Sequence, residues 1–273
     1  MESLKQAMGK FDLEKIRRKA EAMKANSPSL TSLDEVNYEC PKCKDMEGFF
    51  TKQTQYYQDR EYQVDAWIDC ECVKKKALER LMKASAITEE FSKMTFGKFD
   101  LSSVKEIVQE AYTVAYEYVR EFPDIRKLRQ NSIAFLGRPG CGKTHLLTAA
   151  ANNFLAKGIG VIYFPWIEGF NELRNDLSQL DERIRRLQQA EVLFIDDMWK
   201  GTDKPTAFEI KQAFAMVNYR YLNNLPIMLS SERTFAEMCG YDEAVGSRLK
   251  EMCKGHTVTI KGGIELNYRL RED

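Results

Sequence analysis

The sequence lacks long hydrophobic runs. No stretch approaches the roughly 18 consecutive apolar residues that a membrane-spanning helix needs. Residues 1–26 are charged throughout, without the apolar stretch of about 7 to 15 residues that marks a secretory signal. We therefore expect a soluble, cytoplasmic protein with no membrane partner.

An excess of charge of one sign is also missing. Lysine and arginine total 41, and aspartate and glutamate also total 41. A chain with this balance has no global basic field that would attract nucleic acid, although local basic patches can still bind it. Net charge therefore neither indicates nor excludes a DNA-binding function.

The chain does contain enough apolar sequence for one substantial core. Its 273 residues are 44% hydrophobic and 30% charged, which suits a main domain with a smaller appendage. Changes in composition divide it into four expected segments. These are an amphipathic helix and linker over 1–37, a cysteine-containing module over 38–73, a basic helical connector over 74–100 and a large domain over 101–273.

Four of the seven cysteines form two close pairs, Cys40 with Cys43 and Cys70 with Cys72. In a reducing compartment such pairs indicate a metal rather than disulfides. Four thiolates suit a closed tetrahedral structural Zn²⁺, which would contribute the folding free energy that this short segment cannot obtain by burial. A redox pair and incidental cysteines are the alternatives. A catalytic zinc is not expected, because four protein ligands leave no open position.

The large domain alternates apolar strands with longer helical patterns, which is typical of an α/β fold with a parallel sheet. Strands are predicted at 132–136, 160–164, 192–195 and 226–230, and helices at 103–121, 144–157, 167–189 and 205–223.

The first predicted strand and helix of this sheet flank the sequence GRPGCGKT, a match to GxxxxGKT. This context favours a phosphate-binding loop (P-loop), because glycines let backbone amides turn toward phosphates and the helix N-terminus adds a favourable dipole. Lys143 is expected to reach the β- and γ-phosphates and Thr144 to bind Mg²⁺. A glycine turn with a solvated lysine is the alternative. The residues assigned to ATP or ADP in this loop are Gly137, Arg138, Pro139, Gly140, Cys141, Gly142, Lys143, Thr144 and His145.

Two carboxylates, Asp196 and Asp197, follow the strand predicted at 192–195. Sites in parallel sheets form at such C-terminal strand ends. Asp196 fits the Walker B residue that holds Mg²⁺ and so belongs to the nucleotide site, and Asp197 is placed to orient or deprotonate the attacking water. Paired acids after a strand are otherwise often a helix cap. Together with the upstream loop they predict an ATPase that converts ATP and water to ADP and phosphate.

With these motifs in this order, the sequence resembles the bacterial and phage replicative helicase loaders of the DnaC and DnaI type. These are AAA+ ATPases with an N-terminal zinc-binding module. The likeness covers most of the chain and rests on YECPKCKDMEG, CECVKKKALERLMKASAITEEF, TFGKFD, GRPGCGKTHLL, VLFIDDM and EAVGSRL. It looks closest to homologues carried by phages and prophages of Gram-positive bacteria.

The resemblance implies a loader that binds the hexameric replicative helicase and helps place it on single-stranded DNA during replication initiation. It also implies self-association through the ATPase domain, and docking of the helicase by the N-terminal helix and zinc module. Arg248, in GSRL, matches the arginine finger that reaches into the neighbouring subunit's ATP site and stabilises the transition state. A surface arginine is the alternative.

Two sensor positions follow from the same resemblance. Glu232, preceded by Ser231, falls at sensor 1, where loaders often have asparagine. An acid there would repel the γ-phosphate unless it positions water. Arg269, in NYRL, matches the sensor 2 arginine that would contact the nucleotide.

Candidate DNA contacts are weaker. The helix carrying Arg183, Arg185 and Arg186 and the region near Trp166 combine charge with an aromatic ring, and stacking with phosphate neutralisation grips single strands. A solvated charged face is the alternative, as it is for the basic run 74–76.

Other functions remain open. An IstB-type transposition helper would share the AAA+ core and DNA binding, but the predicted zinc module argues against it. A non-catalytic adaptor stabilised by nucleotide is disfavoured by the two acids at 196 and 197. A small-molecule kinase would need a lid and an acceptor pocket that the sequence does not identify.

Overall fold

The structure is a computed structural model that describes residues 38–57, 60–102, 104–201 and 203–270. The amphipathic helix expected near the N-terminus lies outside these residues. The chain divides into two compact units, Met1–Ile68 and Asp69–Asp273, which are described separately. None of the described helices combines the length and apolarity that a membrane crossing requires.

The described part of the first unit is a β-hairpin. Strands β1 (Gly48–Tyr57) and β2 (Arg60–Asp69) form a two-stranded sheet, in the aromatic and glutamine-rich sequence between the two cysteine pairs. Phe50 packs edge-on against Trp67 at a centroid distance of 5.0 Å, yet 69% of Phe50 stays exposed. A hairpin this exposed has little stability by itself, so it needs another source of folding free energy.

The second unit contains the expected parallel α/β sheet, which is confirmed. Five parallel strands lie in the order β4-β5-β6-β3-β7. The strands are β3 (Ile133–Gly137), β4 (Val161–Pro165), β5 (Val192–Met198), β6 (Ile227–Ser231) and β7 (Thr257–Ile260). Strand β7 was not predicted, because its four residues alternate Thr and aliphatic side chains and give no continuous apolar run.

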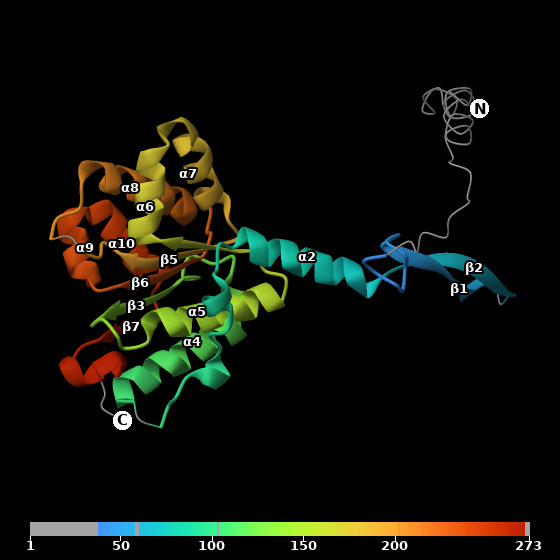
Figure 1. Cartoon of the computed structure of the whole chain (residues 1–273), viewed down its shortest axis with the longest axis horizontal. Coiled ribbons are helices and arrows are strands. Elements are labelled where there is room, and N and C mark those ends of the chain that lie inside the picture. The colour runs from blue at the N-terminus through green and yellow to red at the C-terminus, as the bar shows by residue number, and fades with distance from the viewer. Residues whose placement is uncertain (1–37, 58–59, 103, 202, 271–273) are drawn as a thin grey trace, which may run out of the picture. The chain divides into compact units, whose positions relative to one another are not determined.

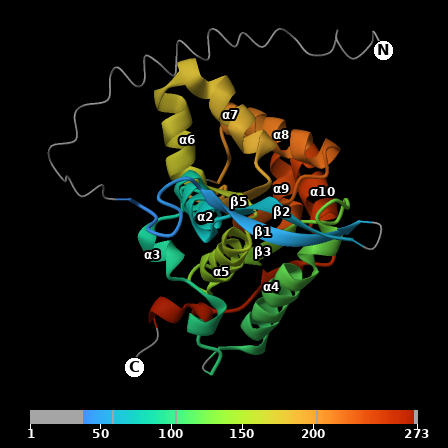
Figure 2. The same ribbon diagram turned by 90° about the vertical axis from the view of Figure 1, so that its right-hand side faces the viewer.

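Helices cover both faces of the sheet (Figures 1 and 2). Along β3, Ile133 and Phe135 pack into the cluster formed with α4 (Glu106–Ile125) and α5 (Lys143–Ala156). Ala134 and Leu136 pack into the cluster on the opposite face. Since both faces are buried, the strands read as continuous apolar runs, which made them easy to predict. The helices of the opposite face are α6 (Trp166–Asn175), α7 (Leu180–Gln189), α8 (Ala207–Leu222), α9 (Phe235–Tyr241) and α10 (Glu243–Met252).

The helix predicted at 167–189 is two helices. The short 3₁₀ turn η2 (Leu177–Gln179) separates α6 from α7. A turn of this kind lets each helix place its own apolar side chains, such as Phe170 and Ile184, against the same core cluster. The sequence pattern alone shows the apolar positions but not the change of direction between the two helices.

Arg220 lies in the last turn of α8 and binds backbone carbonyls of neighbouring loops. Its guanidinium is fully buried and donates to backbone carbonyl oxygens rather than to a carboxylate. The acceptors are the carbonyls of Leu187 (3.0 Å), Gln188 (3.0 Å), Ala190 (2.8 Å), Glu191 (3.5 Å) and Pro226 (2.6 Å). This arginine therefore ties the loops that lead into β5 and β6, the two strands that deliver the acidic residues of the site.

A connecting segment leads from α2 (Glu71–Ala84) across α5 to α4. It contains the short helix α3 (Glu89–Ser92) and the 3₁₀ turn η1 (Phe96–Lys98). The side chain of Asn152, on α5, donates to the carbonyls of Phe91 (2.9 Å), Ser92 (3.3 Å) and Met94 (2.8 Å). One amide group thus fixes the path of the segment next to the phosphate-binding loop.

Candidate nucleotide and metal sites

The phosphate-binding loop connects β3 to α5. Gly140 and Gly142 have φ values of +74° and +91°, in the left-handed region that favours glycine. A Cβ atom on Gly142 would lie 2.8 Å from the ring of Phe99, so that position has no room for a side chain. The loop is anchored to β7, because the backbone N–H of Arg138 donates to the carbonyl of Ile260 at 3.2 Å.

Lys143 curls into its own loop. Its ammonium donates to the carbonyls of Gly137 at 2.8 Å and Arg138 at 2.6 Å, and the residue is only 4% exposed. Burial lowers the pKa of this lysine, while the nearby Cys141, Asp197 and Glu232 act in the opposite direction. A buried cation held only by neutral carbonyls is well prepared to bind phosphate oxygens.

Two other loop side chains make structural contacts. The thiol of Cys141 is buried and donates to the carbonyl of Arg138 at 2.9 Å, and burial raises the pKa of this thiol. The imidazole of His145 lies 3.1 Å from the carbonyl of Thr95 and meets the ring of Phe99 edge-on, with 5.2 Å between centroids. The Cys141 bond stabilises the loop internally, and the His145 contacts hold the loop and the connecting segment together.

Asp196, at the end of β5, is the centre of a hydrogen-bond network. Its Oδ1 accepts from the hydroxyls of Thr144 (2.9 Å) and Ser230, and its Oδ2 accepts from the hydroxyl of Tyr163 (3.1 Å). Burial raises the pKa of Asp196, partly offset by these hydrogen bonds. The structure thus brings together Thr144 and Asp196, the two residues that the sequence assigns to Mg²⁺, although they are 52 positions apart.

Asp197 and Glu232 lie at the ends of adjacent strands and share one cation. The ammonium of Lys200 is 2.7 Å from Oδ2 of Asp197 and 3.7 Å from Oε1 of Glu232. Ser231 is buried and donates to the carbonyl of Met198 at 2.7 Å. Of the two residues considered for sensor 1, Glu232 therefore lines the cavity, and Ser231 stabilises the turn after β5.

These groups surround one cavity of about 640 Å³. Ligand pockets commonly have volumes of about 300 to 1,000 Å³. Its polar end is formed by the phosphate-binding loop, Asp196, Asp197, Lys200 and Glu232. The rest of the lining comes from three parts of the chain, namely the connecting segment, the end of β4 with the start of α6, and the C-terminal residues 266–269. It includes Phe91, Met94, Phe99, Val104, Tyr163, Pro165, Trp166, Ile167, Glu168, Leu266, Tyr268 and Arg269.

The C-terminal segment is bound to the loop directly. The backbone N–H of Tyr268 donates to the carbonyl of Gly140 at 2.9 Å. Asn267 packs so closely on Gly140 that a Cβ atom there would overlap its side-chain amide. Arg269, the proposed sensor 2 residue, lines the cavity. The sequence motifs did not identify the aromatic residues of the cavity lining. The segment TFGKFD, which contributes Phe99 to that lining, was predicted only as a connector, although its two closely spaced phenylalanines were a usable signal.

Arg248 is not among the residues that line this cavity. Its Nη1 donates to the carbonyl of Ala244 at 2.9 Å, within α10. Its guanidinium lies over the rings of Tyr221 and Phe214, at 5.3 and 5.7 Å from their centroids. Within one subunit, therefore, this arginine rests on α8.

The ring of Trp166 is buried and cannot make the stacking contact with DNA that was expected in its region. Trp166 is 1% exposed and packs against Phe170 and Trp199, with centroid distances of 4.4 and 5.9 Å, so its indole has no face free for a base. On α7, Arg183 donates to the carbonyl of Glu172 at 3.2 Å.

The other two arginines of α7 differ in their surroundings. Arg186 donates to the carbonyl of Ala84 at 2.8 Å, whereas Arg185 is exposed. Two of the three arginines thus have hydrogen-bonding roles within the fold, and their assignment to DNA stays a prediction.

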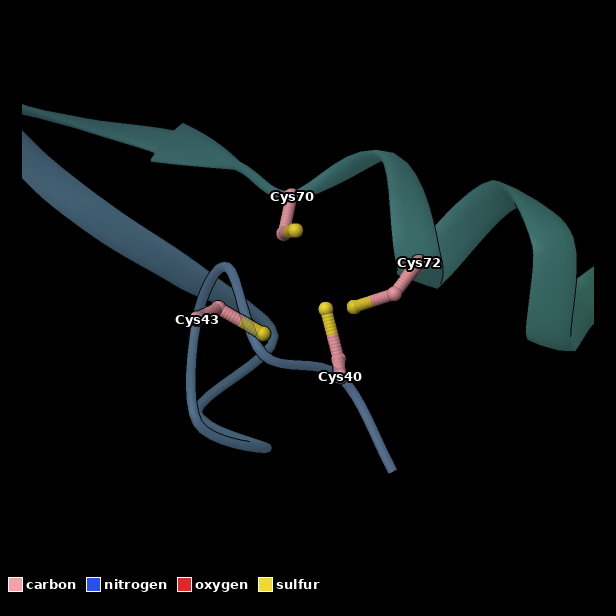
Figure 3. A group of neighbouring side chains, drawn as sticks. All are labelled: Cys40, Cys43, Cys70 and Cys72. Atoms are coloured by element: carbon pink, nitrogen blue, oxygen red, sulfur yellow. The ribbon is translucent and has the colours of Figure 1, made fainter. Parts of the chain in front are cut away.

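The four paired cysteines converge at the base of the hairpin (Figure 3). The sulfur atoms of Cys40, Cys43, Cys70 and Cys72 all lie within 4.8 Å of one another. Sulfurs bound tetrahedrally to one zinc at about 2.3 Å would be about 3.8 Å apart, so small shifts allow a single ion to bind all four. The donor set therefore fits a structural zinc.

Local structure explains how the first cysteine pair is placed. The carboxylate of Asp45 accepts from the backbone N–H groups of Cys40 (2.8 Å) and Glu39 (3.1 Å), and the N–H of Lys44 donates to the carbonyl of Cys40 (2.9 Å). Lys44 and Asp45 adopt left-handed backbone conformations, which close the turn. This turn supports the cysteine thiols, and a bound metal would offset its strain.

Comparison with known proteins agrees with this architecture. A family model described as the bacterial DnaA ATPase domain matches residues 93–254. The phage-like element PBSX protein XkdC of Bacillus subtilis (strain 168) is 40% identical over 263 residues, which cover 94% of this chain and 95% of that protein.

Solved structures share the fold. The crystal structure of DnaI aligns with a TM-score of 0.53 at 20% identity and covers 66% of this chain and 94% of its own. AMPPCP-bound DnaA from Aquifex aeolicus aligns with a TM-score of 0.52 at 26% identity and covers 64% and 51%. These matches confirm the AAA+ P-loop fold that the sequence motifs predicted, and the relative from a phage-like element agrees with the expected prophage association.

Proposed function

The chain belongs to the family of the bacterial DnaA ATPase domain, and on that basis we propose that it is an ATP-dependent loader of a hexameric replicative helicase. In this proposal it binds the helicase and helps place it on single-stranded DNA during replication initiation. The main support is the combination of two features in one chain. One is a P-loop next to paired strand-end acids, and the other is a separate cysteine-bound hairpin with exposed aromatic rings.

The proposed chemistry is attack of water on the γ-phosphate of ATP. The loop amides and Lys143 would bind phosphate oxygens, and Thr144 and Asp196 would hold the magnesium ion. That ion would neutralise charge on the β- and γ-phosphates. Asp197 orients the attacking water, for which it must exchange its contact with Lys200. Membership in an ATPase-domain family supports nucleotide hydrolysis in general.

Assembly would complete the site. Because the Arg248 side chain packs against α8 in one subunit, away from the cavity lining, its proposed role requires a neighbouring copy whose nucleotide site it enters. Binding of ATP between subunits would then favour self-association, and hydrolysis would favour release. Turnover by an isolated subunit should accordingly be slow.

The cysteine-bound hairpin is the proposed docking element for the helicase. Phe50, Tyr56 and Tyr62 are exposed by 69%, 75% and 47%. Aromatic side chains of this kind are enriched at protein interfaces, where they contribute large apolar contact areas. The separation of the hairpin from the ATPase domain, in two compact units, would let one part bind a partner while the other binds nucleotide.

Association with the helicase is the direct test. The full-length protein is mixed with the replicative helicase of its host, in ATP or ADP, and the complex is measured by size-exclusion chromatography with light scattering. A complex that forms in ATP and weakens in ADP is expected. Absence of a complex in both nucleotides would contradict the loader proposal while leaving the ATPase intact. The double change Phe50→Ser and Tyr56→Ser should weaken the complex without altering ATP binding, which tests the docking element separately.

A further inference from the structure

Lys200 is a residue of the site that the sequence motifs did not identify. It follows Asp197 in a tight turn that is closed by a bond from the N–H of Lys200 to the carbonyl of Asp197, at 3.0 Å. Asp197 and Trp199 both have left-handed φ values, +56° and +57°, which non-glycine residues rarely adopt. A strained turn of this kind persists only where the surrounding structure holds it.

The buried ring of Trp199 supplies that support. It packs edge-on against Trp166 and Tyr241, with centroid distances of 5.9 and 5.3 Å. The hydroxyl of Ser230, on β6, also stabilises the start of the turn. It donates to Asp196 and accepts from the backbone N–H of Asp197 at 2.7 Å. The turn, and with it the starting point of the Lys200 side chain, is therefore set by the core and by β6.

The ammonium of Lys200 lies between two carboxylates. It is 2.7 Å from Asp197 and 3.7 Å from Glu232, and all three side chains line the same cavity as Lys143. Its side chain is 37% exposed, so it retains access to the cavity. Although burial lowers the pKa of Lys200, the hydrogen bond and charges of the neighbouring acids raise it overall, which keeps the side chain a cation.

The negative charge of the cavity lining favours a cation at the position of Lys200. Asp196, Asp197 and Glu232 bring three carboxylates to the polar end of the cavity, where ATP would add further negative charge. Among the cations that line the cavity, Lys143 donates to carbonyls of the loop, whereas Lys200 contacts two of these carboxylates directly. Like charges that share a partly buried site repel strongly, because the effective dielectric constant is far below that of water.

We propose that Lys200 is a second phosphate-binding lysine of this site, which neutralises Glu232 and thereby allows an acidic side chain next to the γ-phosphate. This inference rests on the proposed binding and hydrolysis of ATP. Before nucleotide binds, Lys200 pairs with Asp197. When a γ-phosphate is present, the ammonium is shared with it, and Asp197 becomes available to the attacking water. Lys200 thus accounts for the unusual acid at the end of β6.

The predicted signature is a preference for the triphosphate. Because Lys200 contacts the acids rather than the loop that cradles the inner phosphates, its loss should affect ATP more than ADP. Equilibrium binding of Mg-AMPPCP and Mg-ADP to the full-length protein measures this difference. Lys200→Met should weaken AMPPCP binding by about tenfold or more and ADP binding by less than about threefold.

Glu232→Gln provides the decisive partner variant. If Lys200 also acts by neutralising Glu232, the double variant Lys200→Met/Glu232→Gln should regain part of the AMPPCP affinity that Lys200→Met loses, although the contact of Lys200 with the γ-phosphate stays absent. Lys211→Met, which removes an exposed lysine on α8 outside the cavity lining, is the matched control and should bind both nucleotides normally. Equal affinities of Lys200→Met and wild type for AMPPCP, or no rescue in the double variant, would overturn the proposal.

The test also works if Lys200→Met folds poorly. Glu232→Gln alone should then bind AMPPCP at least as tightly as wild type, since one negative charge fewer faces the phosphate. Weaker binding by this variant would equally contradict the proposal. Because the measurement uses nucleotide affinity without helicase, failure of the Lys200 proposal and failure of the loader proposal give different results.

Discussion

The hydroxyl of Tyr163 donates a hydrogen bond to Oδ2 of Asp196 at 3.1 Å. The backbone N–H of the same tyrosine donates to the carbonyl of Ser85 at 2.7 Å, just after α2. Its ring meets Phe91, in the connecting segment, edge-on at 5.6 Å. One residue of β4 thus touches both the carboxylate assigned to magnesium and the segment that leads to the cysteine-bound hairpin.

Tyr163→Phe should lower the affinity for Mg²⁺ in the presence of nucleotide. The change removes one of the donors that orient Asp196 but keeps the ring and its packing. Mutation of a residue that hydrogen-bonds to a metal ligand typically lowers metal affinity by about 10- to 100-fold. A value near the low end is expected here, because the hydrogen bonds from Thr144 and Ser230 to Asp196 remain. A Mg²⁺ titration of nucleotide binding measures the shift. Tyr112→Phe, on α4, is the control, and an unchanged titration for Tyr163→Phe would contradict the proposed positioning role.

Asp196→Asn should stabilise the nucleotide-free protein while abolishing Mg²⁺-dependent hydrolysis. Burial raises the native-state pKa of Asp196 above its ordinary value, so its ionised form disfavours folding. Wild type therefore loses stability as the pH rises through this raised pKa, and the asparagine variant does not.

Urea unfolding at neutral pH should show a gain of about 1 kcal/mol for Asp196→Asn. The gain should shrink as the pH falls and wild-type Asp196 becomes protonated. A stability difference that stayed constant between neutral pH and about pH 4 would show that ionisation of this carboxyl is not its cause. Asp124→Asn, on α4, serves as a comparison for a carboxylate outside the site.

Removal of the metal should unfold the hairpin and leave the ATPase domain folded. The four thiolates are the expected source of folding free energy for a hairpin with little buried surface. Metal analysis should give one zinc per chain, and Cys70→Ser should lose it. Cys239→Ser, at a half-buried cysteine outside the cluster, should keep the metal.

Nucleotide affinity should be unchanged in Cys70→Ser, because none of the four clustered cysteines is among the residues that line the ATP cavity. Helicase association, by contrast, should be lost if the hairpin is the docking element. Zinc-free wild-type protein that retained a fully folded hairpin by NMR would contradict the structural role of the metal.

Arg248→Ala should separate binding from turnover. The isolated variant should bind ATP normally, since the Arg248 side chain packs against Tyr221 of α8 and does not line the cavity. In the assembled state, with helicase and single-stranded DNA, hydrolysis should fall by about 10³-fold or more, as is typical for loss of an arginine finger. Arg129→Ala removes the other guanidinium on Tyr221, at 3.9 Å from its ring, and should leave turnover near wild type. Normal hydrolysis by Arg248→Ala under these conditions would exclude the finger.

Short sequence patterns predict much of the fold and most of the candidate site residues of this protein. The loop GRPGCGKT, the acids after VLFI and the two cysteine pairs are short, and their chemistry depends on neighbours a few positions away. The strands β3 to β6 were predictable for a related reason: burial on both faces makes each a continuous apolar run. Each of these motifs and strands can be recognised within a short window, although the zinc prediction also required combining the two cysteine pairs across the 26 residues between Cys43 and Cys70.

Tertiary structure decided which distant side chains share the site. Parallel strands bring their C-terminal ends to one edge, and only there do Tyr163, Asp196 and Glu232 become neighbours. The same packing turns Trp166 into the core and rests Arg248 on α8. It also places Lys200 between two acids, because a buried tryptophan holds a strained turn. Sequence thus determined the chemical groups available to this protein, whereas the fold set their partners, since charge compensation depends on distance in space.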